Sequence, residues 1–458
     1  MSVDGLKLSA AALILALLTA CSGGGGGADQ PSNVSVVSPA PPTPTGTGGS
    51  QGASRAWPEA RPDSQGMSEQ KLEEAAALAL RDGTFGQAFI VIRNGNIVFE
   101  RYRGISDLEA DAIGQSNPQL SKSSILEKYG TRDKNSLATS WSVAKSFTSM
   151  LFGIAIEQGA INSPQSQVAL YIKDWGTDDK ASITLQDVLD MRSGLVPICS
   201  KSRTSELQEC VGSAASGGDL VYADDQMTLC VTRPKARAGI NYGWWNEGRT
   251  PYPGQSFLYS NCDTMVLAKV LADRRSEDYL KWTQDSLFSK IGMKASWWKD
   301  NAQPQGGNVL GYCCIDATPR DFARLGELVL SRGMASNQQI VSRAYVDAIV
   351  QASATPGTYY ASQFWINTDS VGRRYITASG YDGQTIAVDV PRNIIVVRMG
   401  LYDPILNASG ERVMRLKSGD PNSSNWVGSL PQAMASKYFA NYNVNEVLGL
   451  VSQSVAAP

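Results

Sequence analysis

The chain has 458 residues and contains no histidine, which excludes every serine hydrolase that relies on an imidazole base and every histidine-ligated metal site. Its 41 Lys and Arg residues nearly balance its 43 Asp and Glu residues, and there is no basic run. Nucleic-acid binding is therefore not expected. We also expect no cofactor and no metal, since histidine ligands and a Cys-x-x-Cys pair are both missing from the sequence.

The N-terminus predicts an exported lipoprotein. Lys7 precedes an apolar run at residues 8–18, which is too short for a stable membrane anchor and is typical of a secretory signal. The run leads through Leu-Thr-Ala to Cys21, which resembles the lipobox of bacterial lipoproteins. Residues 1–20 are then a signal peptide and Cys21 carries the lipid. By the same resemblance, Ser22 favours the outer membrane, facing the periplasm; an ordinary signal peptide is the alternative.

Composition divides the remaining chain into two parts. Residues 21–56 are mostly Gly, Ser, Pro and Thr with few large apolar side chains, so they are predicted to form a disordered tether. Residues 57–455 have the composition of a single large globular domain. No later stretch is long and apolar enough to cross a membrane.

The first half of this domain has clear local signals. Residues 68–80 are predicted to be a helix capped by Ser68. Two β-rich runs at 88–93 and 97–100 flank Asn94-Gly95, which predicts a hairpin. A polar, poorly periodic segment follows, and apolar spacing then predicts a helix from Ser142 to about Gln158.

The second half contains further helices and then strands. A long insert with three cysteines is expected at residues 196–251, after the helix at 183–191. Helices are predicted at 183–191, 258–272, 279–291, 319–332, 432–439 and 444–451, and strands at 363–367, 374–378, 384–390 and 393–398. Strands thus lie near both ends, with a mostly helical region at about 140–350 between them. The predicted class is α/β (α+β), with one antiparallel sheet built from both ends of the chain and flanked by helices.

The cysteines outside the signal region are even in number, which favours disulfides in an exported protein. Spacing does not decide their pairing, so Cys199 with Cys210 or Cys230, and Cys262 with Cys313 or Cys314, remain open. A bond between the adjacent Cys313 and Cys314 is expected to be strained, so each is predicted to pair elsewhere.

Three short motifs carry residues suited to nucleophilic chemistry. Ser142 and Lys145 lie three positions apart in a predicted helix and so share one face, which places an amine beside a hydroxyl at the helix N-terminus. Tyr259-Ser260-Asn261 stands at the head of another predicted helix. Ala378-Ser379-Gly380-Tyr381 stands where a strand gives way to a turn.

These motifs resemble those of the serine β-lactamase-like superfamily. The branch is that of class C β-lactamases, related carboxylesterases and nylon-oligomer hydrolases, with the last group most similar. That group shares a Ser-Trp-Ser-x-x-Lys-Ser segment and an Ala-x-Gly-x-x-Gly-Gln segment, and residues 183–195 and 318–326 are further matches. The likeness covers roughly residues 60–451.

The resemblance implies a role for each matched residue. Ser142 is the acylated nucleophile, Lys145 accepts or relays its proton, and Tyr259 is a general base or acid. We expect burial to lower the pKa of Lys145 and the neighbouring ammonium to lower the pKa of Tyr259. Asn261 is expected to bind Lys145 or the substrate.

The same resemblance places the oxyanion hole at the backbone N–H groups of Ser142 and Tyr381, with Ser379 and Gly380 beside it. Ala378 stands where β-lactamases and cell-wall peptidases have a lysine or histidine. A methyl group cannot hold a substrate carboxylate, so recognition of penicillin-type substrates loses one anchor.

The sequence therefore predicts a serine hydrolase that cleaves a small-molecule ester, amide or peptide-like bond. The alternatives are a β-lactamase or cell-wall DD-peptidase, and an inactive envelope-binding lipoprotein of the same fold. Tyr242, Trp244 and Trp245 are candidates for a substrate wall, whereas Trp297 and Trp298 are expected to serve packing. The natural substrate and the oligomeric state are not predicted.

Overall fold

The structure, a computed structural model, describes residues 55–456 with several internal gaps. The gaps are 117–120, 178, 197, 201–206, 210–219, 221–222, 224, 238–239, 241–252, 275–277, 301–306 and 402–441. Several predictions fall outside the described residues: the signal peptide, nearly all of the tether, the helix at 432–439, and the residues Cys21, Cys210, Tyr242, Trp244 and Trp245.

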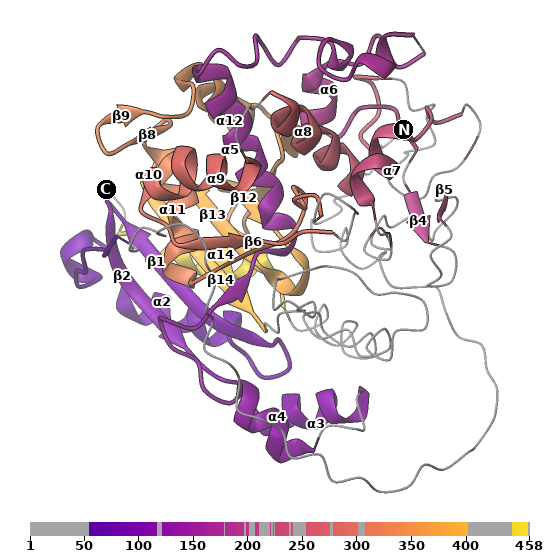
Figure 1. Cartoon of the computed structure of the whole chain (residues 1–458). Coiled ribbons are helices and arrows are strands. Elements are labelled where there is room, and N and C mark those ends of the chain that lie inside the picture. The colour runs from indigo at the N-terminus through magenta and orange to yellow at the C-terminus, as the bar shows by residue number, and fades with distance from the viewer. Residues whose placement is uncertain are drawn as a thin grey trace, which may run out of the picture.

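A seven-stranded antiparallel sheet forms the centre of the fold (Figure 1). In spatial order its strands are β10 (Tyr360–Ala361), β11 (Phe364–Thr368), β12 (Arg374–Ser379), β13 (Thr385–Asp389), β14 (Ile394–Gly400), β1 (Gly86–Arg93) and β2 (Asn96–Tyr102). The prediction of one antiparallel sheet built from both ends of the chain is confirmed, and the structure adds that the first strand pairs with the last.

The Asn-Gly pair fixes the first hairpin. Asn94 has a φ of 51° and Gly95 a φ of 79°, so both central residues are left-handed, as the tight turn between two twisted strands requires. β1 then pairs with β14 in a register that places Ile90 opposite Val397. This register closes the sheet between the two ends of the chain.

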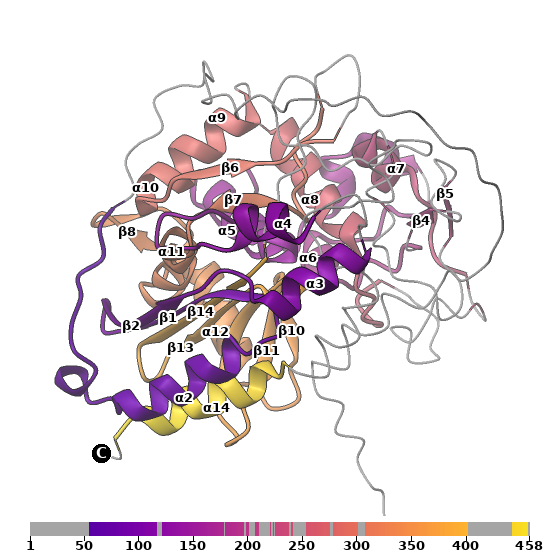
Figure 2. The same cartoon turned by 90° about the horizontal axis from the view of Figure 1, so that it is seen from below.

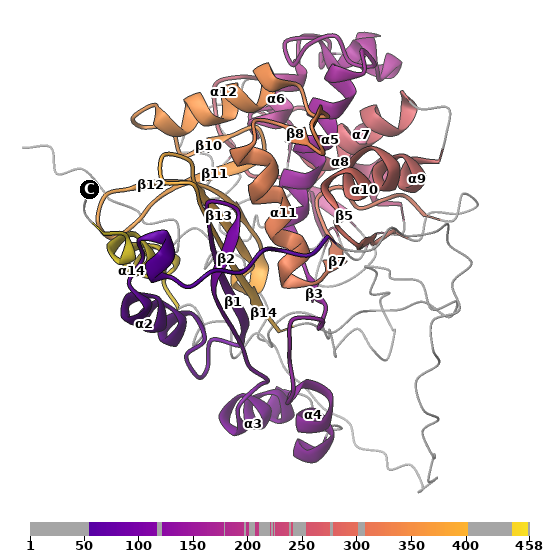
Figure 3. The same ribbon diagram turned by 90° about the vertical axis from the view of Figure 1, so that its left-hand side faces the viewer.

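Side chains alternate across the sheet between two separate cores. On β1, Ile90 and Ile92 face the larger core, while Phe89 and Val91 face the smaller one. Helices α2 (Glu69–Ala79) and α14 (Val444–Ser454) pack side by side over the smaller core (Figure 2). Helices α5 (Ala144–Glu157), α11 (Pro319–Leu330) and α12 (Arg343–Ala354) contribute to the larger core. Figure 3 shows α5 and α11 on the opposite side of the strands from α2 and α14.

The region between β2 and β10 is mostly helical, as predicted. Its α-helices are α3 (Asp107–Ser116), α4 (Lys122–Tyr129), α5, α6 (Leu185–Leu189), α7 (Gln226–Thr232), α8 (Asn261–Asp273), α9 (Tyr279–Thr283), α10 (Ser289–Ile291), α11 and α12. A π-helical turn, η9 (Gln284–Phe288), joins α9 to α10. The remaining strands form small sheets: β3 (Ala138–Thr139), β7 (Ile315–Ala317) and β6 (Ala295–Trp297); β4 (Ile198–Ser200) and β5 (Leu207–Glu209); β8 (Met334–Ala335) and β9 (Gln338–Gln339).

Several elements differ from the sequence prediction. The segment interpreted as polar and poorly periodic contains α3 and α4, and the cysteine-containing insert contains α7. α7 has only seven residues, too few to show a helical period. The helix predicted from Ser142 begins instead with a 3₁₀ turn, η3 (Trp141–Val143), before α5.

The cysteine pairing also differs from the prediction. Cys313 and Cys314 are bonded to each other, so the expectation that each pairs elsewhere was wrong. Cys262 is bonded to Cys230, a pairing that the sequence reasoning did not consider. The reason is that α7 packs against α8 and brings the two Cα atoms to 4.8 Å, within the usual range for a disulfide.

Within the described residues, no helix has both the length and the apolar character needed to cross a membrane. The same part of the chain holds no group of acidic or cysteine side chains that forms a metal site.

Candidate active site

Ser142 and Lys145 meet at the start of α5. The Lys145 Nζ atom lies 3.0 Å from the Ser142 Oγ atom, within hydrogen-bond distance. The 3₁₀ turn at residues 141–143 presents Ser142 partly to solvent, while Lys145, one turn later, is 1% exposed. Ser142 is thus partly accessible and the amine is enclosed.

The other acceptors around Lys145 carry no charge. Nζ lies 2.7 Å from the Asn261 Oδ1 atom and 3.3 Å from the Tyr312 carbonyl oxygen. The rings of Tyr259 and Tyr312 face it, with centroids at 5.0 and 5.2 Å. Among the described residues no carboxylate forms an ion pair with Lys145. Burial without a counter-ion lowers the pKa of Lys145 well below its usual value of 10.5, as expected from the sequence.

Tyr259 lies beside Ser142, but its pKa is not lowered as the sequence predicted. Its phenol is hydrogen-bonded to Ser142, and this bond lowers its pKa. Burial has the larger effect and raises the pKa of Tyr259 above its usual value of 10.0. The expectation of a lowered pKa was wrong, because it relied on a neighbouring ammonium, whereas the enclosed Lys145 favours its neutral form.

An aromatic group supports Tyr259 from the sheet side. Its ring stacks on Trp365 of β11, with centroids 5.5 Å apart and planes at 29°. Tyr360 of β10 meets the same Tyr259 ring edge-on at 6.2 Å. These contacts fix the plane of the phenol next to Ser142.

Tyr259 and Asn261 are placed by the start of α8. Tyr259 precedes the helix, Ser260 is its N-cap in an extended conformation, and Asn261 is its first residue. The sequence predicted a helix from about residue 258. The later start leaves Tyr259 and Asn261 on either side of an extended residue, and both reach the Ser142–Lys145 pair.

The third motif lies against the backbone of the nucleophile. A Cβ placed on Gly380 would lie 2.5 Å from the Ser140 carbonyl oxygen, 3.0 Å from the Trp141 Cβ atom and 3.1 Å from the Ser142 nitrogen. Only glycine allows this approach. Ser379 at the end of β12 and Tyr381 at the start of the following turn are partly exposed next to it.

Trp141 joins the first and third motifs. Its backbone is left-handed, with a φ of 45°, which is costly for a bulky residue. Its Nε1 atom donates to Asp382 Oδ2 at 2.9 Å, and its ring packs edge-on against Tyr381 at 5.9 Å. These contacts hold the backbone turn that presents Ser142.

The family comparison agrees with this geometry. Residues 69–400, more than half of the chain, match the family model described as Beta-lactamase. The chain belongs to the beta-lactamase family.

A relative of this chain is a named hydrolase. The chain is 22% identical over 349 residues to a 6-aminohexanoate-dimer hydrolase of Paenarthrobacter ureafaciens, a match that covers 73% of this chain and 76% of that protein. The resemblance noted from the motifs is confirmed. The chain is a hydrolase of the beta-lactamase fold.

Solved structures show the same fold. A candidate 6-aminohexanoate-dimer hydrolase of Bacillus anthracis superposes with a TM-score of 0.52 at 19% identity, covering 85% of this chain and 88% of that one. A candidate β-lactamase of Bacteroides dorei superposes with a TM-score of 0.51 at 14% identity, covering 82% of this chain and 99% of that one. At these identities the superpositions establish the β-lactamase/transpeptidase-like fold.

In this beta-lactamase family member, two contributors to the site escaped the sequence reasoning. Tyr312 supplies a backbone carbonyl to Lys145, and no sequence signal marks a carbonyl because every residue has one. Trp365 stacks on Tyr259 from a strand that the sequence did predict. Ala378 is 1% exposed within the larger core.

Proposed function

We propose that the chain is a serine hydrolase that cleaves an ester or amide bond through an acyl-enzyme at Ser142. One observation carries this proposal: an enclosed lysine amine lies 3.0 Å from a partly exposed serine hydroxyl and has only neutral acceptors around it. In a chain without histidine, this amine replaces the imidazole base.

The proton steps follow from the two pKa directions. Neutral Lys145 accepts the Ser142 proton as Oγ attacks the substrate carbonyl carbon and a tetrahedral intermediate forms. When that intermediate collapses, the bond to the leaving group breaks and protonated Tyr259 donates its proton to the departing atom. The Lys145 ammonium then returns a proton to Tyr259. A water molecule then attacks the acyl carbon and gives a proton to neutral Lys145. The bond from that carbon to Ser142 Oγ breaks, Oγ takes the proton back from Lys145, and the acid is released.

The developing oxyanion needs donors close to Ser142. We assign them to the backbone N–H groups of Ser142 and Tyr381. The support is the close approach of Gly380 to the Ser142 backbone. Donors of this kind are worth about 2.7–4 kcal/mol of barrier lowering each.

The substrate class is an ester or amide without an essential carboxylate. Ala378 supplies no cation at the position where β-lactamases and DD-peptidases carry one, so the β-lactamase alternative lacks this anchor. The Paenarthrobacter relative is named for the 6-aminohexanoate dimer, so that amide is the first compound to assay.

A fluorophosphonate probe tests the nucleophile. The wild-type protein is expected to lose probe reactivity when Ser142 is changed to Ala, and the labelled peptide is expected to contain Ser142. Labelling that persists in Ser142→Ala refutes the assignment. Turnover is then measured on p-nitrophenyl esters, the 6-aminohexanoate dimer and nitrocefin, with nitrocefin expected to be the poorest. A folded protein that turns over none of them supports an inactive envelope-binding role instead.

We also propose that Cys21 carries a lipid and anchors the protein to the bacterial envelope, in the outer membrane facing the periplasm. The support is the apolar run followed by Leu-Thr-Ala-Cys. Cys21→Ser is expected to abolish incorporation of labelled fatty acid and to release the protein from the membrane fraction. Continued membrane association without label counts against the anchor.

A further inference from the structure

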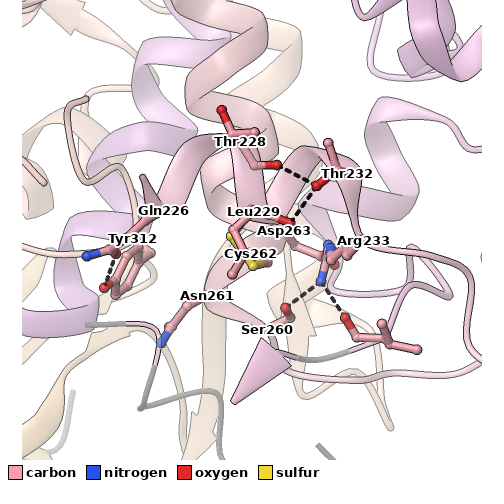
Figure 4. Close-up of a disulfide and its surroundings, with 12 residues drawn as sticks. Gln226, Thr228, Leu229, Thr232, Arg233, Ser260, Asn261, Cys262, Asp263 and Tyr312 are labelled. Carbon is pink, nitrogen blue, oxygen red and sulfur yellow. Dashed lines mark hydrogen bonds and ion pairs between the residues drawn. A yellow bond between two sulfur atoms is a disulfide. The ribbon is translucent and has the colours of Figure 1, made fainter. Parts of the chain in front are cut away.

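Helix α7 and Arg233, the residue after it, make three contacts with the residues that surround Lys145. None of these contacts is with Lys145 itself. The first point is Gln226, whose Oε1 atom accepts a hydrogen bond from the Tyr312 hydroxyl at 2.8 Å (Figure 4). The backbone carbonyl of the same Tyr312 accepts from Lys145. Gln226 itself is fixed to the domain, because its backbone N–H donates to Asp300 at 3.0 Å.

The second point is the disulfide between Cys230 and Cys262. It joins the middle of α7 to the second residue of α8, directly after Asn261 (Figure 4). Asn261 supplies the nearest acceptor of Lys145, at 2.7 Å. A covalent bond one residue away restricts the backbone from which that acceptor projects.

The third point is Arg233, which caps the C-terminus of α7. It is 2% exposed, forms an ion pair with Asp263, and donates to the Ser260 hydroxyl at 2.8 Å. Asp263 is also fully buried and accepts from Ser193 at 2.8 Å. Ser260 lies between the two catalytic-motif residues Tyr259 and Asn261, so Arg233 holds the backbone that positions both.

We propose that segment 226–233 is a positioning element for the proton-transfer groups, and that the Cys230–Cys262 disulfide makes hydrolytic efficiency depend on the oxidised state of this pair. This inference rests on the proposed function. Besides Ser142, Lys145 donates to the Tyr312 carbonyl and to the Asn261 side chain, and the segment is attached close to both: Gln226 bonds the Tyr312 hydroxyl, and the disulfide holds the residue after Asn261.

Two carboxylates that lie close in sequence to the motifs around Lys145 have partners elsewhere. On α8, Asp263 pairs with Arg233; on the turn after β12, Asp382 accepts from Trp141. The titratable groups whose rings face Nζ are Tyr259 and Tyr312. Burial raises the pKa of both phenols. The pH dependence of acylation therefore reports on Lys145 itself.

The disulfide is tested by changing Cys230 and Cys262 together to Ala and measuring the acylation rate by the fluorophosphonate probe across pH. A displacement of Asn261 by about 1 Å is expected to lower the rate about 100-fold. Water entering beside a loosened α8 raises the pKa of Lys145 toward its usual value, so the rising limb of the profile is expected to move to higher pH.

Trp175→Phe is the matched control. The Trp175 Nε1 atom donates to the Val231 carbonyl of α7 at 3.0 Å, so this variant weakens the packing of α7 without breaking any of the three contacts described. It is expected to lower thermal stability while the position of the pH limb stays unchanged. If the pH limb shifts equally in Trp175→Phe and in the cysteine variant, the shift comes from general destabilisation, and the proposal is overturned.

A second measurement avoids the risk that the cysteine variant does not fold. Gln226→Met and Tyr312→Phe each remove one side of the 2.8 Å hydrogen bond, and the double variant completes the cycle. We expect each single change to lower the acylation rate and the double change to lower it no further. Full additivity, or single changes without effect, contradicts the role of Gln226.

The two hypotheses fail in different ways. Absence of Ser142 labelling in the wild-type protein rejects the hydrolase mechanism. Normal Ser142 labelling, together with an unchanged rate and pH profile in a folded Cys230→Ala/Cys262→Ala protein, rejects only the positioning role of segment 226–233.

Discussion

The surroundings of Lys145 determine the protonation state of its amine. An exposed lysine is protonated at neutral pH and cannot accept a proton. Here the amine is 1% exposed and is met by a hydroxyl, an amide oxygen and a carbonyl oxygen. Removing water without supplying a negative partner favours the neutral amine. Burial raises the pKa of Tyr259, so in the proposed mechanism the phenol stays protonated and donates to the leaving group.

The pH profile of acylation separates these two roles. The base is neutral Lys145, so the rate is expected to rise as pH passes through its lowered pKa and to level off above it. Tyr259 stays protonated between about pH 6 and 9 and adds no second limb. Tyr259→Phe is expected to lower turnover of the 6-aminohexanoate dimer, whose amide nitrogen must be protonated as it leaves, about 100-fold or more without moving the limb. The measurements are the probe acylation rate and the amide turnover, each against pH. A flat profile, or a limb that disappears with Tyr259, contradicts the assignment.

Gly380 makes the most sterically demanding backbone contact in the site. Gly380→Ala would place a Cβ atom 2.5 Å from the Ser140 carbonyl, so one of the two backbones must move. We expect a loss of about tenfold or more in the acylation rate because the oxyanion donors shift with it. Gly176→Ala is the control, since its Cβ would meet nothing closer than 3.9 Å. Equal activity in the two variants means that Gly380 does not position the donors.

Helix α11 packs closely against the central sheet. Its N-cap Thr318 accepts from the Asp321 N–H, Pro319 begins the helix, and Gly326 faces the sheet. Thr318 and Pro319 are helix-start signals that can be recognised in the sequence. The contact that Gly326 makes with β14 is different, because it depends on a strand about seventy positions later in the chain.

Gly326→Ala tests this helix–sheet contact. Its Cβ would lie 2.6 Å from the Ile395 Cγ2 atom, so the helix must move or the isoleucine must change rotamer. We expect a loss of about 1–3 kcal/mol in the free energy of unfolding by denaturant titration. Ile395→Ala in the same chain removes the opposing methyl groups, so the double variant is expected to cost less than the sum of the single changes. Strict additivity indicates that the two sites do not meet.

Segments from the beginning and the end of the described chain pack against each other. β1 pairs with β14, and α2 lies beside α14 across the smaller core, so residues from both termini complete one sheet and one helical layer (Figure 2). The motifs that carry the proposed catalytic residues lie at the start of α5, at the start of α8 and after β12. Their geometry therefore depends on a sheet that requires both ends to form.

Leu448→Ala tests this dependence. Leu448 on α14 is fully buried in the smaller core, and its truncation is expected to cost about 2–5 kcal/mol. Leu450→Ala on the same helix removes a partly buried side chain and is expected to cost less. Unfolding is followed by circular dichroism and by loss of Ser142 labelling. Coincident transitions are expected; loss of labelling well before unfolding of the sheet contradicts the coupling.

Local chemistry determined a large part of this protein. Asn94-Gly95 specified the hairpin, Ser68 marked a helix start, and the spacing of Ser142 and Lys145 placed an amine beside a hydroxyl. These features act over a few residues, so the sequence displays them. A single sheet built from both ends of the chain also followed, because strands stood near both ends with helices between.

Only the tertiary structure decided how the catalytic groups ionise and what holds them. The pKa of Tyr259 depends on burial against Trp365 and Tyr360, and the partner of Cys262 depends on how α7 packs. Both are set by residues distant in the chain. Desolvation and disulfide pairing depend on distances in space, and spacing along a chain does not give those distances until the fold is known.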